Sequence, residues 1–368
     1  MDIANLANVY GEREHPYFIY APRWIDSSAG IKALHYLCHS INMSGKKAFL
    51  IFTEEQFMGQ PRVNPELLTP VLTQEISDAY YKSRITPITI YSEMILDNPL
   101  NATCVVRYLM NYAGALGGAH SFDETELVVA FSKNIARKYA LENRIDQPAV
   151  LFLPPIDPRE FEKNLIKEPY QVIYAGKYRS FVGKPFEVGN LPTVEIFRDG
   201  PRMQTRDQVK LILSKASILY SFENSSIVSE AILSGTPARF VKNDFLEEVI
   251  AENELGNCGI VQADTEAAFD EANESLDEGI AQYYKQVGVF IESLNEFINS
   301  TQIHASRIGF SHPLVIPVHN QLVSRHRVSL AYQILKNHGL SRLLRVVARF
   351  FLRRAKWKYW AQRKIPNK

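Results

Sequence analysis

A polar stretch near residue 225 carries residue types that bind phosphorylated ligands. Asn224, Ser225 and Ser226 follow the apolar run SILYSF and precede the helical pattern IVSEAILSG. Such a turn exposes backbone N–H groups at the positive end of a helix dipole, which favours an anion such as a phosphate. Glu230 lies one helical turn further along, where its carboxylate can accept hydrogen bonds from a ribose diol. The stretch therefore predicts a nucleotide site, with an ordinary capped helix as the alternative.

A second loop brings positive charge to the same edge of the predicted fold. Residues 171–175 form a run typical of a strand, and Lys177, Arg179 and Lys184 lie in the loop that follows. Loops after the strands of a parallel sheet emerge at its carboxyl edge, so we expect these cations to converge with the polar turn on a diphosphate. There they would stabilise the negative charge of a departing nucleotide. For any one cation, a solvated surface position is the more common alternative.

Both loops belong to a chain in which short apolar runs alternate with helical patterns. The first half contains the runs YFIY, KKAFLIF, PITIYSE, ATCVVRYLM, ELVVAFS and AVLFLPP, and Pro154, Pro155 and Pro158 separate it from a similar second half. This alternation predicts parallel sheets with helices on both faces. We therefore expect an α/β protein with two Rossmann-like domains that face each other across a cleft. Between Gly176 and Thr193 we expect a loop with at most one helical turn.

Polar residues near the strand ends of the first half are candidates for the other substrate of a reaction. His120 and Asp26 are the first candidates for a general base, and Glu93 has the same capacity. The further candidates on turns at this edge are Ser28, Gly30, Asn111 and Gly114. For each residue alone, a surface or capping position is the more common role.

The polar turn and its helix resemble a family signature. The pattern S-x-x-x-E-A-x-x-x-G-x-P, formed by Ser226, Glu230, Ala231, Gly235 and Pro237, resembles that of GT-B glycosyltransferases, in particular retaining family 4-like enzymes. Together with the proline-rich linker and the basic C-terminal residues, the resemblance predicts three parts: an acceptor domain over residues 1–160, a nucleotide-sugar domain over 161–302, and C-terminal helices with a basic amphipathic tail over 303–368.

The resemblance also implies roles for individual residues. The glutamate at position 230 would hold the donor ribose, and the small residues before it the diphosphate. Gly176 with Lys177 and Lys184 resembles the phosphate-binding loop of the family, and the Ser28–Gly30 turn resembles its acceptor-side glycine loop. With the charges described above, the donor-binding candidates are Gly176, Lys177, Arg179, Lys184, Glu223, Asn224, Ser225, Ser226 and Glu230.

One position departs from the family pattern. Retaining families have an acidic residue eight positions before the ribose glutamate, where this chain has Phe222, with Glu223 one position later. The departure admits a variant such as the bacterial Kdo transferases, which use a CMP-sugar. The Asp-x-Asp pair with which GT-A enzymes hold a divalent metal occurs nowhere in the sequence, so we expect no metal and no cofactor besides the nucleotide-sugar substrate.

Positive charge is concentrated at the C-terminal end of the chain. The net charge is +1 over 368 residues, yet residues 341–368 contain ten Lys or Arg and no Asp or Glu. Arg342, Arg345, Arg349 and Arg353 recur at helical spacing among apolar and aromatic residues, which is typical of a helix in the interface of an anionic membrane. A helix packed on the domains and a nucleic-acid site are the alternatives, and nothing else in the chain supports the second.

These features together predict a metal-independent glycosyltransferase of bacterial surface polysaccharide synthesis, such as that of O-antigen, capsule or lipopolysaccharide. We expect a lipid-linked glycan acceptor and no nucleic-acid partner. The three cysteines are far apart and no apolar run is long enough to span a membrane. We therefore expect a cytoplasmic protein that associates with the inner face of the membrane through residues 341–360. The alternatives are a nucleotide-sugar epimerase of the same shape and a non-catalytic subunit that binds glycans or sugar nucleotides.

Overall fold

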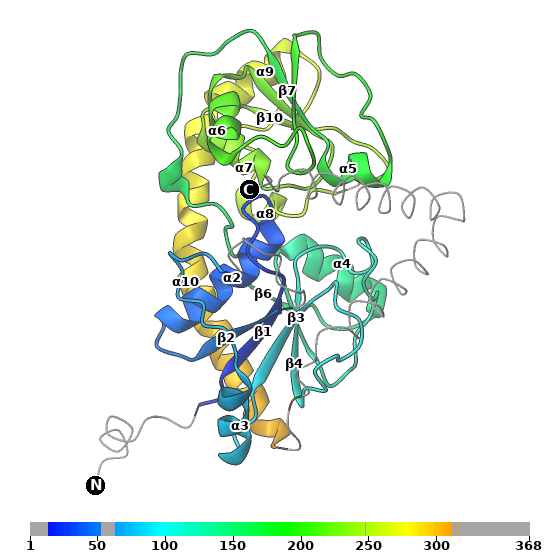
Figure 1. Cartoon of the computed structure of the whole chain (residues 1–368). Helices are drawn as coiled ribbons and strands as arrows, with labels where there is room; N and C mark the ends of the chain where they lie inside the picture. The colour runs from blue at the N-terminus through cyan, green and yellow to red at the C-terminus, as the bar shows by residue number, and fades with distance from the viewer. Residues whose placement is uncertain (1–13, 53–62, 247, 311–313, 315–368) are drawn as a thin grey trace, which may run out of the picture.

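Two parallel β-sheets, each with its own helices, build the molecule. The computed structural model describes residues 14–52, 63–246, 248–310 and 314. The two sheets lie in separate halves, one above the other in Figure 1, and the expected α/β architecture with two Rossmann-like units is confirmed. The basic tail at residues 341–368 lies outside the described residues, so its helix stays a prediction.

The sheet of the first half has six strands in the order β2-β1-β3-β4-β5-β6, all of them parallel. The strand bounds are β1 Tyr17–Ala21, β2 Ala48–Phe52, β3 Ile88–Ser92, β4 Cys104–Leu109, β5 Leu127–Ala130 and β6 Ala149–Val150. Strands β1, β3 and β4 are buried along their whole length. Continuous apolar runs are expected there because helices cover both faces of a parallel sheet.

The sheet of the second half has four parallel strands in the order β10-β9-β7-β8. Their bounds are β7 Gln171–Tyr174, β8 Thr193–Ile196, β9 Ile218–Ser221 and β10 Ala238–Phe240. Strand β7 lies between β8 and β9, so the order of the strands reverses next to it. Ligands bind at the carboxyl ends of strands at such a reversal.

Helices surround the two sheets. The bounds are α2 Ala29–Met43, α3 Gln74–Lys82, α4 Lys133–Asn143, α5 Gly176–Phe181, α6 Arg206–Lys215, α7 Ile227–Leu233, α8 Glu252–Leu255, α9 Glu266–Glu274 and α10 Leu276–Ile308, with a short 3-10 turn η1 at Pro158–Glu160. Helix α2 begins at Ser28, whose hydroxyl accepts a hydrogen bond from the Ile31 N–H at 3.4 Å. The hydroxyl thus satisfies one of the free N–H groups of the first turn.

The connection from β7 to β8 contains a longer helix than we expected. Helix α5 has six residues, which is more than one helical turn. Its N-cap residue, Ala175, offers no side-chain acceptor. The Glu223 carboxylate replaces that cap from outside the segment, because it accepts hydrogen bonds from the N–H groups of Lys177 and Tyr178. A partner 45 residues away in the chain therefore stabilises this short helix.

Helix α10 joins the two halves. Its contacts include α7 and α8 in the second half and β3 and β4 in the first, and it runs along one side of both sheets in Figure 1. Leu294 and Phe297 are buried in the core of the first sheet. The Tyr17 hydroxyl of β1 lies 2.8 Å from the Thr301 hydroxyl of α10, and either group can donate the hydrogen bond.

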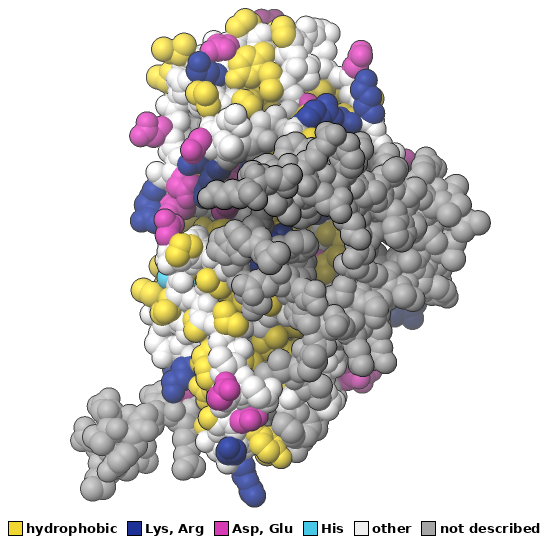
Figure 2. All heavy atoms as spheres, viewed as in Figure 1, with side chains coloured by type: hydrophobic (Ala, Val, Ile, Leu, Met, Phe, Trp, Pro, Cys, Tyr) yellow, Lys and Arg dark blue, Asp and Glu magenta, His cyan; other side chains and the backbone are white. Residues whose placement is uncertain are grey.

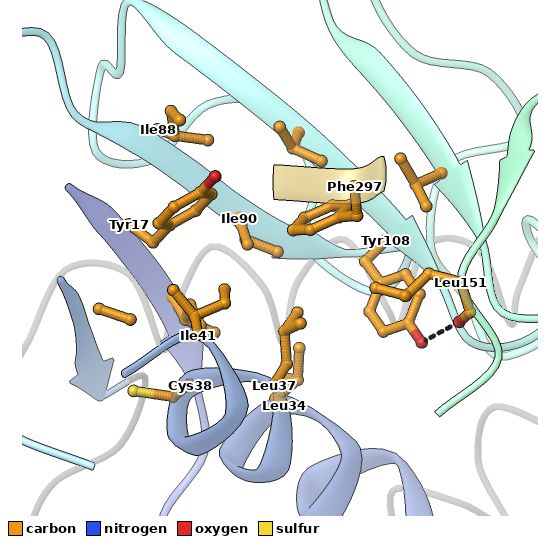
Figure 3. Packing of buried hydrophobic residues seen from close by; sticks show 14 of the residues in the cluster. Tyr17, Leu34, Leu37, Cys38, Ile41, Ile88, Ile90, Tyr108, Leu151 and Phe297 are labelled. Atoms are coloured by element: carbon orange, nitrogen blue, oxygen red, sulfur yellow. Dashed lines mark hydrogen bonds between the residues drawn. The ribbon is translucent and has the colours of Figure 1, made fainter. Parts of the chain in front are cut away.

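The core beneath α10 also receives α2. Leu34 and Ile41 of α2 pack against the strand residues, while Phe297 of α10 lies beside Tyr17 and Ile90 (Figure 3). The ring centroids of Tyr17 and Phe297 are 6.2 Å apart. Both helices are thus seated on the first sheet by the same apolar cluster.

The domain bounds proposed from the sequence stay a prediction. Position 160 is the last residue of η1, which lies between the two sheets in the chain. Position 302 lies inside α10, whose last residues pack on the first sheet.

Polar contacts close the junction between the halves. The Lys133 N–H at the start of α4 donates to the Glu254 carboxylate of α8 at 2.8 Å, and the Asn134 amide donates to the Val249 carbonyl at 2.8 Å. In the linker, the Glu160 carboxylate of η1 forms ion pairs with α6. Figure 2 shows acidic and basic side chains next to one another at this level of the molecule, on the left edge of the view.

The linker is also held by one tyrosine, which gives a test of the junction. The Tyr283 hydroxyl donates to the Ile156 carbonyl and accepts from the Ile156 N–H, both at 3.0 Å. We expect Tyr283→Phe to lower the free energy of unfolding by about 1–3 kcal/mol, because both backbone groups stay buried without a partner. Tyr284→Phe is the control, since Tyr284 is 48% exposed. Urea unfolding measures both variants, and equal losses of stability would contradict this role.

Candidate functional site

Charged residues of the two halves act on one another where the carboxyl ends of the two sheets meet. Burial raises the pKa of the Glu93 carboxyl, which follows β3, and the Lys177 ammonium of the second half partly offsets this. Burial lowers the pKa of Lys32 on α2, and the Glu230 carboxylate on α7 partly offsets it. The residues after β1 and β3 therefore lie near those after β7 and β9, at the edges where α/β sheets bind ligands.

Glu230, the predicted ribose ligand, is buried in an ion pair. Its side chain is 7% exposed, and one guanidinium nitrogen of Arg198 lies 2.8 and 2.7 Å from its two carboxylate oxygens. Arg198 follows β8 and Glu230 lies in α7, so the pair connects the segment after β8 to α7. A buried charge-assisted contact of this kind orients the carboxylate and neutralises it.

Lys32 approaches the same carboxylate from the first half. It lies in the first turn of α2, and only 3% of the residue is exposed. Burial lowers the pKa of its ammonium to about 8. The other charges that act on it are Glu230 and Glu160, which raise this pKa, and Arg206 and Arg198, which lower it. Lys32 thus brings a positive charge from the first half into the surroundings of Glu230.

Glu223 and Gly176 fit together at the end of β7. Gly176 has φ +28°, and a Cβ there would lie 2.5 Å from a Glu223 carboxylate oxygen and 2.7 Å from the Tyr174 hydroxyl. Only glycine leaves room for this carboxylate. Burial raises the pKa of Glu223, and Lys177 and the N–H groups of α5 oppose the rise. Glu223, one of the predicted donor-binding residues, thus caps the helix that begins in the predicted phosphate-binding loop.

The three predicted cations of the second half differ in their surroundings. Lys177 and Lys184 are exposed. Arg179 instead forms an ion pair with Glu195, and its guanidinium carbon lies 5.4 Å from the centre of the Phe197 ring. Two lysines thus remain on the surface near α5, whereas Arg179 binds to β8 and the residue that follows it.

The polar turn before α7 is partly used by the fold. Asn224 donates to the Glu248 carbonyl and accepts from the Ile250 N–H, both at 2.9 Å, which fastens the following loop. The Ser225 hydroxyl accepts from the Ile227 N–H at 3.4 Å. Ser226 is the N-cap residue of α7 and makes no side-chain cap.

Glu93 is the most deeply placed acid among the candidates of the first half. It is 4% exposed, and its carboxylate accepts the Met110 N–H at 3.0 Å. A Cβ at Gly118 would lie 2.0 Å from the Glu93 carbonyl, so the glycine-rich loop lies directly on this residue. Burial raises the pKa of Glu93 to about 7, against the opposing effects of the Met110 N–H and Lys177. A carboxylate with this pKa can exchange a proton near neutral pH.

The other two candidates for a base lie in different surroundings. Asp26 is exposed and accepts a hydrogen bond from the indole of Trp24 at 2.8 Å. His120 is exposed, and its ring lies against Gly114, where a Cβ would be 2.2 Å from the nearest ring atom. Neither has the burial that shifts the pKa of Glu93.

The remaining acceptor-side candidates shape the loops. Ser28 caps α2, and a Cβ at Gly30 would lie 3.9 Å from the end of the Met110 side chain. The Asn111 side chain accepts the Tyr112 N–H at 2.8 Å. The loop after β1 thus lies close to the loop after β4.

The described part of the chain contains no group of three or more His, Cys, Asp or Glu side chains arranged to hold a metal ion. Within those same residues, no helix combines the length and the apolar character that crossing a membrane requires.

Sequence reasoning missed two residues of this site. Arg198 directly follows the strand run TVEIF, and its position at a strand end was a usable signal. Lys32 carries no such signal, because a lysine in the early turns of a helix is most often solvated. Its burial depends on the second half, whose position the local pattern does not reveal.

The comparisons with known proteins find partial likeness to solved structures. No family model and no curated protein match the sequence. Among solved structures, WaaG, a glycosyltransferase involved in lipopolysaccharide biosynthesis, has 11% identity and a TM-score of 0.40 over 79% of this chain and 98% of that one. The calicheamicin glycosyltransferase CalG4 has 12% identity and a TM-score of 0.39 over 80% and 99%. A glycosyltransferase from Rickettsia africae has 11% identity and a TM-score of 0.38 over 89% and 100%. Likenesses of this size do not assign the chain to a family.

Proposed function

We propose that this protein is a metal-independent glycosyltransferase of GT-B architecture. The second half binds a nucleotide sugar, the first half binds a glycan acceptor, and the sugar passes between them at the junction. The observation that carries the proposal is the meeting of charged groups from both halves: Glu93 with Lys177, and Lys32 with Glu230. A transfer reaction needs such groups from both sides, because donor and acceptor must be held in contact.

In this proposal Glu93 is the general base. The acceptor hydroxyl oxygen forms a bond to the anomeric carbon, the bond from that carbon to the diphosphate breaks, and Glu93 takes the hydroxyl proton. Cations at the junction stabilise the charge on the departing nucleotide, so that no metal is required for this step. The raised pKa supports Glu93 over the exposed Asp26 and His120.

The biological setting that we propose is the assembly of bacterial surface polysaccharide on a lipid-linked acceptor, at the inner face of the cytoplasmic membrane. The support is the run of basic and aromatic residues in 341–360, which suits an anionic lipid surface.

The first test concerns the donor. We expect Glu230→Gln to weaken binding of the preferred nucleotide sugar about 10- to 100-fold, because a neutral amide replaces a charged acceptor of the ribose hydroxyls. A thermal-shift screen against UDP, GDP, CMP and dTDP selects the nucleotide, and calorimetry measures the affinity. Glu274→Gln on α9 is the matched surface control. An unchanged affinity in Glu230→Gln would remove this residue from the site.

The second test concerns the base. We expect Glu93→Gln to lower kcat about 10²- to 10⁴-fold, the usual contribution of a general base. The wild-type rate should rise with pH through about 7 as Glu93 loses its proton, and this limb should vanish in the variant. Lys177→Met should move the limb to higher pH, because the cation that lowers the pKa of Glu93 is gone. Lys184→Met, in the same segment, should leave the limb in place. A pH profile that Glu93→Gln does not alter would rule out the base assignment.

The third test concerns the membrane. Deleting residues 341–368 should reduce co-sedimentation with vesicles of anionic lipid, because up to about 1 kcal/mol per basic residue is lost. Transfer to a soluble acceptor fragment should persist in the truncated protein. Equal sedimentation of the two proteins would refute the membrane role of the tail.

A further inference from the structure

Lys32 is a buried residue that places a positive charge between the two halves of the molecule. It is 3% exposed, and within the described residues no hydrogen bond or ion pair engages its ammonium group. A buried ammonium without a partner is strongly disfavoured relative to one in water. Its position therefore calls for an explanation other than packing alone.

The charges around Lys32 do not balance it. Four charged groups act on it: Glu230 from α7, Arg198 after β8, Arg206 from α6 and Glu160 from η1. These four form two ion pairs with each other, Arg198 with Glu230 and Arg206 with Glu160. Because Glu160 also pairs with Lys210, neither group carries a surplus negative charge that could balance the ammonium of Lys32 within the described residues.

We propose that Lys32 and Arg198 bind a diphosphate between them, one residue from each half, and that this diphosphate belongs to the nucleotide-sugar donor. The proposal rests on the glycosyltransferase function proposed above and adds the residues that hold the leaving group. A diphosphate supplies at least two negative charges and several acceptor oxygens, which suit an ammonium and a guanidinium together.

The Arg198–Glu230 pair defines how the donor enters. The ribose hydroxyls donate hydrogen bonds to the Glu230 carboxylate in place of Arg198. The Arg198 guanidinium then binds the diphosphate beside Lys32. Because Lys32 belongs to the first half, the phosphate site is complete only when the two halves are together. Donor binding and the juxtaposition of the two halves are therefore coupled.

Inorganic pyrophosphate is the probe that tests the phosphate site apart from the sugar and the base. Calorimetry on the full chain should show that Lys32→Met lowers pyrophosphate affinity about tenfold or more, as expected for a charge-assisted contact. Lys285→Met, an exposed lysine on α10, is the control and should bind as the wild type does. The Lys32→Met variant should keep the wild-type fold, because an apolar side chain of similar length replaces a buried charge.

Two further readouts separate direct binding from a structural role. Lys32 has a pKa of about 8, so the affinity ratio of wild type to Lys32→Met should fall as pH rises from about 7 to 9.5. Glu230→Gln should strengthen pyrophosphate binding, because Arg198 loses its partner, while it weakens nucleotide-sugar binding. Opposite signs in one variant follow only if the ribose and phosphate ligands are distinct.

The source of the diphosphate is decided by competition. Displacement of pyrophosphate by UDP, GDP or dTDP supports the nucleotide-sugar donor as the source. Displacement by farnesyl diphosphate alone would overturn that assignment in favour of a lipid diphosphate.

Pyrophosphate affinities that are equal in wild type and Lys32→Met, or no pyrophosphate binding by the wild type, would overturn the Lys32 site. Such a result would leave transfer activity and its dependence on Glu93 intact if the glycosyltransferase proposal is correct. Lys32-dependent pyrophosphate binding without any sugar transfer would instead remove the glycosyltransferase proposal alone.

Discussion

The packing of α10 across both sheets is the constraint on which the rest of the structure depends. Its later turns bury Leu294 and Phe297 in the core of the first sheet, while the same helix contacts α7 and α8 of the second half. At 1.5 Å per residue, a helix of 33 residues is about 50 Å long, enough to reach both halves. Because the helix is continuous, it fixes which sheet edges face one another, and with them the approach of Lys177 to Glu93.

Each buried acid at this junction has its own means of support. The Glu223 carboxylate accepts hydrogen bonds from two N–H groups of α5, and the Glu230 carboxylate accepts them from the Arg198 guanidinium. Glu93 accepts the N–H of Met110, and burial raises its pKa to about 7 against the opposing effect of Lys177. These differences give side chains of the same type different surroundings: Glu223 caps a helix, Glu230 is neutralised by an arginine, and Glu93 has a raised pKa. Environment rather than residue type separates them.

Much of the fold could be predicted, because its signals are local. Apolar runs of strand length identified the strands, and a polar turn followed by a helical run identified α7. The length of α5 could not be predicted, because its cap comes from Glu223, far along the chain. Of the predicted cations, Arg179 forms an ion pair with Glu195. Arg198, which the sequence pattern did not single out, forms the ion pair with Glu230. Which arginine forms an ion pair with which acid depends on the arrangement of the strands in the folded sheet.

The sequence by itself determined the two α/β halves, the strand ends at which polar residues gather, and Glu230 as a carboxylate of interest. These follow from hydrophobic periodicity and turn chemistry, which act over a few residues. Only the tertiary structure decided that Lys32 is buried, that Arg198 holds Glu230, and that Glu93 is buried with a raised pKa, whereas Asp26 and His120 are exposed. Those properties depend on the loss of water and on charges from segments that are distant in the sequence, and both arise only when the chain has folded.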